Sequence, residues 1–369
     1  MKRNPLKEVF QYFFKLGFVA FGGPAAHVAM MQDDLVEKRR WLSTQEFLDY
    51  MGATNLIPGP NSTEMTMHCG YHHAGARGLF VAGMSFIIPA VTLTLLVAIF
   101  FEKAAAIAWM IPIINGIKAA VISFIVGAII KLGKKAIKSF ELLIVGALVI
   151  VASWLGINEI ICILCAGLLY MLTKWAMTSR STLSVFPFLF FLKVPYSSFT
   201  LFLIFLKVGL VLFGSGYVLF AYLDGELIDS TGWLSHPDLV EAIAIGQITP
   251  GPVLSTATFI GYKVGGLQGA LLATVGIFTP SFFYVWALNK FITQFQKSDT
   301  LKQFLAAVNV AAIAVMVVVT IKMGESILID WKTILICIIS FIAYFTYKGI
   351  NTLWIILGGG VAGFLLSYF

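Results

Sequence analysis

The stretch NLIPGPNS at 55–62 decides how this chain folds, because two prolines one residue apart cannot lie inside a continuous helix. A second copy occurs in ITPGPVLS at 248–255, and long apolar runs surround both copies. We therefore expect a helix to break at Pro58 and again at Pro250. A new helix is expected to begin at Pro60, because proline suits the first turn.

The two PGP motifs belong to an internal repeat. A shift of 192 residues places Lys15 on Lys207, Trp41 on Trp233 and the first PGP on the second. A shift of 191 continues the match, for example from Pro89 to Pro280. We predict two homologous repeats, at 1–185 and 190–369. Duplication of this kind is typical of secondary transporters, whose substrate sites lie where the repeats meet.

The composition indicates a membrane protein. Hydrophobic residues make up 59% of the chain and charged residues 12%, against about 25% charged in soluble domains. Several apolar runs are long enough to cross a hydrocarbon core of about 30 Å. They occupy Leu79–Phe101, Ala104–Ile130, Leu267–Leu288 and Phe304–Ile321. Because lipid leaves backbone polar groups unsatisfied outside helices and closed barrels, and no strand pattern occurs, we expect an all-α polytopic membrane protein.

Loop charges predict that the repeats are inverted, because basic residues stay on the cytoplasmic side. Lys38, Arg39 and Arg40 precede Trp41, whereas acidic residues precede Trp233. Inversion requires an odd number of crossings per repeat. We expect a helix at 9–30, a broken or re-entrant Gly/Pro segment at 45–73 and four further helices, which makes about five spanning helices. The basic N-terminus instead favours an interfacial first segment, which would change this count.

The helix starts after the PGP motifs are candidate anion sites, because free amides and a partial positive charge gather there. Two such starts, facing each other across the repeats, could hold a dianion together with nearby hydroxyl and amide donors. In the alternative interpretation the glycines and prolines only permit kinks or tight helix crossings. The candidate residues are Gly22, Gly23, Pro24, His27, Asn55, Pro58, Gly59, Pro60, Asn61, Ser62, Thr63, Glu64, Gly214, Ser215, Gly216, Gln247, Pro250, Gly251, Pro252, Ser255 and Thr256.

Two lysines complete the candidate site. Lys15 and Lys207 occupy the same repeat position inside apolar segments, and intramembrane cations are often functional. They could neutralise a divalent anion, or they could reach the interface with their charged ends. Arg39 and Arg40 could attract anions to a cytoplasmic mouth, although a basic loop is more often a topology signal.

Glu64, His68 and His72 recur every four residues and would share one helix face. A role in proton coupling or gating is one hypothesis, and a plain polar face is the other. Metal binding is disfavoured, because zinc-site spacing is missing and the second repeat has Thr256, Ile260 and Val264 at the matching spacing. We expect no metal and no cofactor.

The pattern resembles the chromate ion transporter family. The matching stretches are FGGPAAH (21–27), VEKRRWLS (36–43), NLIPGPNS (55–62), GLFVAGMSFIIPA (78–90), FGSGY (213–217) and ITPGPVLSTATFIGY (248–262). The resemblance spans nearly the whole chain. It implies a two-domain carrier of the bacterial or archaeal inner membrane that extrudes chromate, with sulfate as a substrate of similar shape.

Together these observations predict a transporter, not an enzyme, that exports a tetrahedral oxyanion. No ATP-binding motif occurs, so the membrane potential or ion coupling would drive transport. An anion channel and a proton-coupled uptake carrier for sulfate-like anions are the alternatives. The expected partners are the oxyanion, the lipid bilayer and, as one oligomeric option, a second copy in a homodimer. No nucleic acid is expected.

Overall fold

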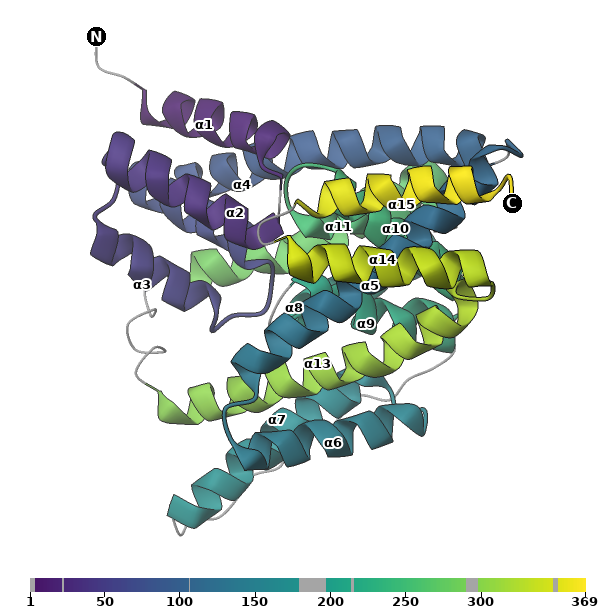
Figure 1. Ribbon diagram of the computed structural model, residues 1–369. Helices are drawn as coiled ribbons and strands as arrows, with labels where there is room; N and C mark the ends of the chain where they lie inside the picture. The colour runs from purple at the N-terminus through teal and green to yellow at the C-terminus, as the bar shows by residue number, and fades with distance from the viewer. Residues whose placement is uncertain are drawn as a thin grey trace.

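The structure is a computed structural model, and it describes residues 4–21, 23–105, 107–178, 197–213, 216–289, 298–347 and 351–369. Within these ranges the regular secondary structure is entirely helical, as Figure 1 shows. The predicted all-α class is therefore confirmed. The predicted junction between the repeats, around 185–190, lies outside the described residues.

The first repeat opens with two helices where we expected one at 9–30. α1 ends at Val19, and α2 begins at Gly23, whose φ of 75° is followed by Pro24. Proline removes an amide donor and disfavours helical geometry in the residue before it, so the chain breaks here. The elements are α1 (Pro5–Val19), α2 (Gly23–Met31), the π-helix η1 (Gln32–Lys38), α3 (Thr44–Thr54), α4 (Asn61–Ala105), α5 (Met110–Ala136), α6 (Phe140–Trp154) and α7 (Glu159–Thr178).

The second repeat follows the same order, 191 or 192 residues later. Even the π-helix recurs, since η3 at Asp224–Ser230 lies 192 residues after η1. The repeat predicted from the sequence is therefore confirmed in three dimensions. Its elements are α8 (Ser198–Val211), η2 (Gly216–Val218), α9 (Leu219–Leu223), η3 (Asp224–Ser230), α10 (His236–Ile248), η4 (Val253–Ser255), α11 (Thr256–Leu288), α13 (Asp299–Ile327), α14 (Trp331–Thr346) and α15 (Thr352–Leu366).

α4 and α11 are tight helical hairpins. Gly75 has a φ of 65° and Gly266 a φ of 58°, and each follows a residue with non-helical dihedrals. A Cβ atom on Gly70 would lie 2.5 Å from the carbonyl oxygen of Gly78, although eight residues of straight helix span about 12 Å. The chain therefore reverses at Gly75, a turn that the PGP motif alone did not predict.

The last two helices of each repeat pack on the other repeat. α6 and α7 lie against α13, while α14 and α15 lie against α5, and Figure 1 shows these two groups at separate places in the molecule. By contrast, α1 packs on α4 and α8 on α11, within their own repeats, and the two hairpins pack on each other. The repeats are thus intertwined around a shared centre.

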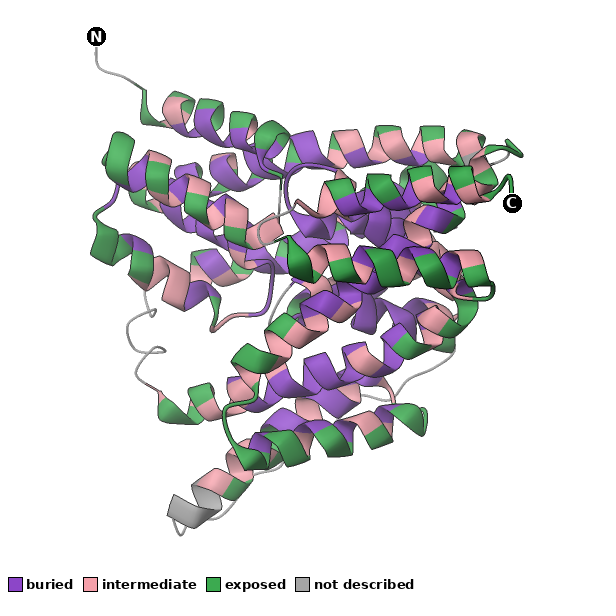
Figure 2. Cartoon of the chain, in the orientation of Figure 1, coloured by how far each residue is buried: buried purple, intermediate pink, exposed green. Residues whose placement is uncertain are grey.

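Burial follows this arrangement. The buried residues concentrate in the centre of the molecule, and the outer helices expose one side (Figure 2). Large apolar side chains such as Leu148, Leu169 and Trp354 are more than half exposed, which suits contact with lipid. Among the described residues, four apolar segments are long enough to cross a membrane, two in each repeat: Asn61–Ala104, Met110–Ala136, Val253–Ala287 and Asp299–Ile327. They contain most of the apolar runs identified in the sequence.

Candidate functional site

The two PGP loops are tied to opposite repeats by a reciprocal pair of backbone hydrogen bonds. The amide of Gly59 donates to the carbonyl oxygen of Leu212 at 2.7 Å, and the amide of Gly251 donates to that of Ala20 at 3.0 Å. Gly59 and Gly251 are equivalent in the repeat, as are Ala20 and Leu212. Each loop is therefore seated at the end of the first helix of the other repeat, about a pseudo-twofold axis.

A helix begins directly after each loop, as predicted. The carbonyl oxygen of Pro60 accepts hydrogen bonds from the amides of Thr63 and Glu64, at 2.8 and 3.1 Å, and that of Pro252 accepts one from Ser255 at 2.9 Å. The prolines of both motifs are buried. The amide-rich helix starts thus lie within the protein, where a partial positive charge is weakly screened.

Buried polar atoms without hydrogen-bond partners gather around the first PGP loop. They are Oγ1 of Thr63, both carboxylate oxygens of Glu64 and Oγ of Ser281. The side chains of Glu64 and Ser281 lie against Gly59, because a Cβ atom on this glycine would collide with both. Leaving a buried donor or acceptor unsatisfied costs about 1–3 kcal/mol, so this group is costly unless a ligand or proton completes it.

Gln247 adds a donor beside the second loop. Its Nε2 atom is buried without a partner three residues before Pro250. The neighbouring hydroxyls are satisfied within the protein: Thr94 donates to Ser255 at 3.1 Å, and Thr256 donates to the carbonyl oxygen of Val253 at 2.7 Å. The two loops therefore differ, because the first retains more unsatisfied polar groups.

His27 lies at the junction of the repeats. Its side chain is buried, its Nε2 donates to the carbonyl oxygen of Ala20 at 3.0 Å, and its ring packs edge-on against Phe86. The same carbonyl accepts the amide of Gly251. In the neutral ring Nδ1 then carries a lone pair, so it can accept a hydrogen bond but cannot donate one. His27 thus supports the loop contact, and the anion-donor role considered for it is not favoured.

The remaining loop residues form the walls around this centre. Asn61 donates to the exposed Asn55 at 2.7 Å, and Ser62 is buried. A Cβ atom on Gly23 would lie 3.1 Å from the hydroxyl of Tyr217, and one on Gly216 would lie 3.5 Å from Val253. The glycine-rich loops therefore also approach the repeat boundary. Gly22, Gly214 and Ser215 lie outside the described residues.

The two lysines differ in their surroundings. Lys207 forms an ion pair with Glu226 at 2.7 Å. Lys15 is exposed and lines a half-open pocket of 730 Å³ together with Asp34, the repeat equivalent of Glu226. For Lys207 the ion pair favours charge neutralisation within its own repeat over a role in holding a shared dianion.

Alignment of the hairpins corrects one sequence comparison. Because Gly70 matches Gly261 and the turn at Gly75 matches that at Gly266, the shift after the PGP break is 191. The equivalents of Glu64, His68 and His72 are therefore Ser255, Phe259 and Lys263, not Thr256, Ile260 and Val264. Glu64 and His68 therefore have no titratable equivalent in the second repeat, whereas the position of His72 is occupied there by Lys263.

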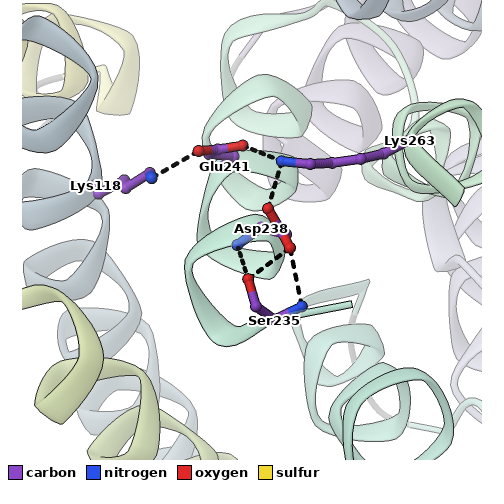
Figure 3. Close-up of polar contacts among 5 residues, drawn as sticks. All are labelled: Lys118, Ser235, Asp238, Glu241 and Lys263. Atoms are coloured by element: carbon purple, nitrogen blue, oxygen red, sulfur yellow. Dashed lines mark hydrogen bonds and ion pairs between the residues drawn. The ribbon is translucent and has the colours of Figure 1, made fainter. Parts of the chain in front are cut away.

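A charge network that no sequence pattern indicated joins the repeats. Lys118 on α5 pairs with Glu241 on α10 at 2.6 Å, and Lys263 on α11 pairs with both Glu241 and Asp238 at 2.5 Å. Figure 3 shows the network, including the hydrogen bond that the Ser235 hydroxyl, at the start of α10, donates to the carboxylate of Asp238. Only the spatial meeting of α5 with the second repeat reveals it, since the residues share no sequence spacing.

A second ionic cluster also escaped prediction. Glu159, Asp224 and Asp229 place carboxylate oxygens within 4.8 Å of one another. Lys322 lies 2.9 Å from Asp229 and 3.5 Å from Asp224, and His236 lies 3.1 Å from Asp224. Because Lys322 and His236 pair with two of the three carboxylates, the cluster is best described as an ionic contact between α7, η3 and α13.

Comparison with known proteins gives one consistent result. The model of the family described as "Chromate transporter" matches residues 7–171 and 199–364. The chain is 31% identical over 353 residues to a "Probable chromate transport protein" of Synechococcus elongatus, covering 92% of this chain and 89% of that protein. It is 28% identical over 376 residues to a "Chromate transport protein" of Cupriavidus metallidurans, covering 98% and 93%.

A shorter relative corresponds to one repeat. The "Uncharacterized transporter YwrB" of Bacillus subtilis is 25% identical over 165 residues, which are 43% of this chain and 81% of that protein. No solved structure matches the chain.

Proposed function

The chain belongs to the chromate transporter family, and from this premise we propose that it exports a tetrahedral oxyanion, chromate or the similarly shaped sulfate, through a site between the two PGP loops. The protein is a multi-pass membrane transport protein and not an enzyme. Its proposed place is the inner cell membrane.

The observation that carries the proposal is the set of unsatisfied buried donors beside the reciprocal loop contact. Thr63, Ser281 and Gln247 each keep a buried polar atom without a partner, and two helix starts lie next to them. A tetrahedral oxyanion presents four oxygens in different directions, so donors from both repeats can share it. Helix N-termini favour negative charge, which adds to the attraction.

Energetics favour export. Moving one charge across 100 mV changes the free energy by about 2.3 kcal/mol. A dianion that leaves an inside-negative cell therefore gains about twice that amount for each 100 mV, and no nucleotide is required.

The test is efflux from liposomes that contain the purified protein and labelled chromate or sulfate. We expect saturable efflux that rises with an inside-negative potassium diffusion potential and falls at least tenfold in Thr63→Ala and Gln247→Ala. Exposed Gln45→Ala serves as the matched control. Absence of flux for every tetrahedral oxyanion from a folded protein would refute the substrate assignment.

The two alternatives differ in what this assay records. A channel would give flux that does not saturate over the accessible range of anion concentration. A proton-coupled uptake carrier would accumulate the anion against its gradient when the outside is acidified. The burial of both PGP loops favours a carrier. An anion bound in a buried site can enter and leave only when the protein opens first to one side of the membrane and then to the other.

A further inference from the structure

We propose that Glu64 binds a proton together with the anion, so that each oxyanion is carried with a proton, and that His72, Tyr50 and His68 connect Glu64 to the protein surface. The inference rests on the proposed function for its anion partner. The geometry around Glu64 supports it independently.

Glu64 is the least compensated carboxyl group in the candidate site. Its side chain is fully buried, and neither oxygen has a hydrogen-bond partner. It forms no ion pair among the described residues. A buried carboxylate without a partner carries a large desolvation cost, so the neutral acid is the favoured form. An anion beside it favours the neutral form further, because two negative charges at such a distance repel in a weakly screened interior.

A path of titratable groups leads away from Glu64 along one face of α4. His68 lies one helical turn later, where Cβ atoms are about 5–6 Å apart, and His72 lies one turn beyond it. His68 is buried, and its Nδ1 contacts Oδ1 of Asn289 at 3.2 Å. An amide oxygen only accepts hydrogen bonds, so Nδ1 carries the proton and Nε2, which has no partner, is free to receive one.

The path reaches solvent through α3. The ring of Tyr50 stacks on that of His68 at 5.0 Å, and its hydroxyl lies 3.3 Å from Nδ1 of His72. Nε2 of His72 lies 4.0 Å from Glu46, whose side chain is 48% exposed. On this proposal a proton enters at His72, and Tyr50 and His68 must rotate to carry it inward, because a ring stack does not itself transfer a proton.

The other ionisable groups around the path do not neutralise Glu64. α11 contributes Tyr284, which lies near enough to interact with Glu64 electrostatically and donates its hydroxyl to the carbonyl of Leu210. α3 contributes Asp49, which accepts from Gln45. On α8, Lys207 is paired with Glu226. The second repeat has Ser255 and Phe259 in place of Glu64 and His68, so one path exists per chain.

Coupling of this kind is compatible with export. One proton moving with a dianion leaves a net charge of minus one, which an inside-negative potential still drives outward. The anion affinity should fall about tenfold per pH unit above the pH at which Glu64 loses its proton, because anion binding then requires proton uptake.

The experiment compares wild type, Glu64→Gln and the exposed control Glu141→Gln in liposomes with an internal pH dye and a clamped potential. Efflux of the anion should make the lumen alkaline in wild type and in the control. Glu64→Gln should move fewer protons per anion than wild type, and the anion flux that it retains should become insensitive to pH. Chromate in the bulk solution takes up protons to the same extent with all three proteins, so this contribution to the pH signal cancels when they are compared.

Equal proton movement in wild type and Glu64→Gln, or wild-type anion flux without protons, would overturn the proposal and leave the oxyanion function intact. If wild type carries no oxyanion, the proposed function fails, and an infrared pH titration of the purified protein decides the role of Glu64. A protonated carboxyl band that titrates and is missing in Glu64→Gln supports proton binding there. No difference between the two proteins contradicts it.

The path has its own test. His68→Phe, which installs the residue that the second repeat has at this position, should slow proton uptake at least tenfold in stopped-flow measurements while the equilibrium titration of Glu64 persists. An unchanged rate would exclude His68 from the path.

Discussion

The amide nitrogen of Gly59 lies 2.7 Å from the carbonyl oxygen of Leu212, and this hydrogen bond joins the first PGP loop to the second repeat. Its counterpart joins Gly251 to Ala20. The packing at these glycines is tight, since a Cβ atom on Gly251 would lie 2.6 Å from that of Ala90. The two bonds thus join the repeats at two equivalent positions.

Gly251→Ala should therefore impair transport and stability together. Gly251 has a φ of 92°, and the added methyl group must displace Ala90. Strain at such a φ costs about 1–3 kcal/mol, and overpacking a similar amount. Gly232→Ala is the control, because Gly232 has a φ of 67° but open space around its Cβ position. Thermal unfolding and efflux measure both effects, and equal losses in the two variants would argue against a special role for the loop contact.

Glu241→Gln should destabilise the protein strongly. The side chains of Lys118 and Glu241 are 12% and 10% exposed, and removing one partner of a buried ion pair costs about 3–5 kcal/mol. Asp299→Asn breaks the pair with Lys302, whose side chains are 86% and 53% exposed, and should cost at most about 1 kcal/mol. Denaturant titration compares the two. A Glu241 variant as stable as the Asp299 variant would show that the network in Figure 3 does not hold the repeats together.

The packing of each repeat's last two helices on the other repeat predicts how the protein behaves when the chain is split into two fragments. Fragments 1–185 and 190–369, expressed together, should assemble and transport, because α14 and α15 cover α5 while α6 and α7 cover α13. Each fragment alone should be degraded or aggregate, since its central helix would lose that cover. Co-purification with a tag on one fragment is the measurement. Stable, monomeric single fragments would contradict the intertwined packing.

Acidification should loosen the start of α3. The backbone amide of Ser43 donates to Glu46 and lowers the pKa of that carboxyl group, with further help from the Ser43 hydroxyl. A carboxyl group with a lowered pKa contributes stability at neutral pH, and this stability is lost as the pH falls through the lowered value. The protection factors of the first-turn amides, each taken relative to the intrinsic exchange rate at the same pH, should therefore fall in acid. Glu46→Gln should remove that pH dependence; persistence of the same dependence would assign it to another group.

Much of the candidate site could be predicted from residue patterns. Two prolines one residue apart, as at Pro58 and Pro60 and again at Pro250 and Pro252, interrupt a helix, so these broken segments follow from backbone chemistry. The position of Lys15 was harder to interpret. Its match to Lys207 indicated a shared function, yet Lys207 pairs with Glu226 whereas Lys15 is exposed and lines a pocket. No sequence pattern reports which partner a side chain meets.

By itself the sequence determined the membrane class, the duplication and the helix starts after both PGP motifs, because hydropathy, repeat spacing and proline geometry act locally along the chain. Tertiary structure alone decided that the terminal helix pairs exchange between repeats, that Lys118 meets Glu241, and that both oxygens of Glu64 lack partners. Those features depend on which surfaces meet across the pseudo-twofold axis. Contacts between residues far apart in sequence leave no periodic signal in a single chain.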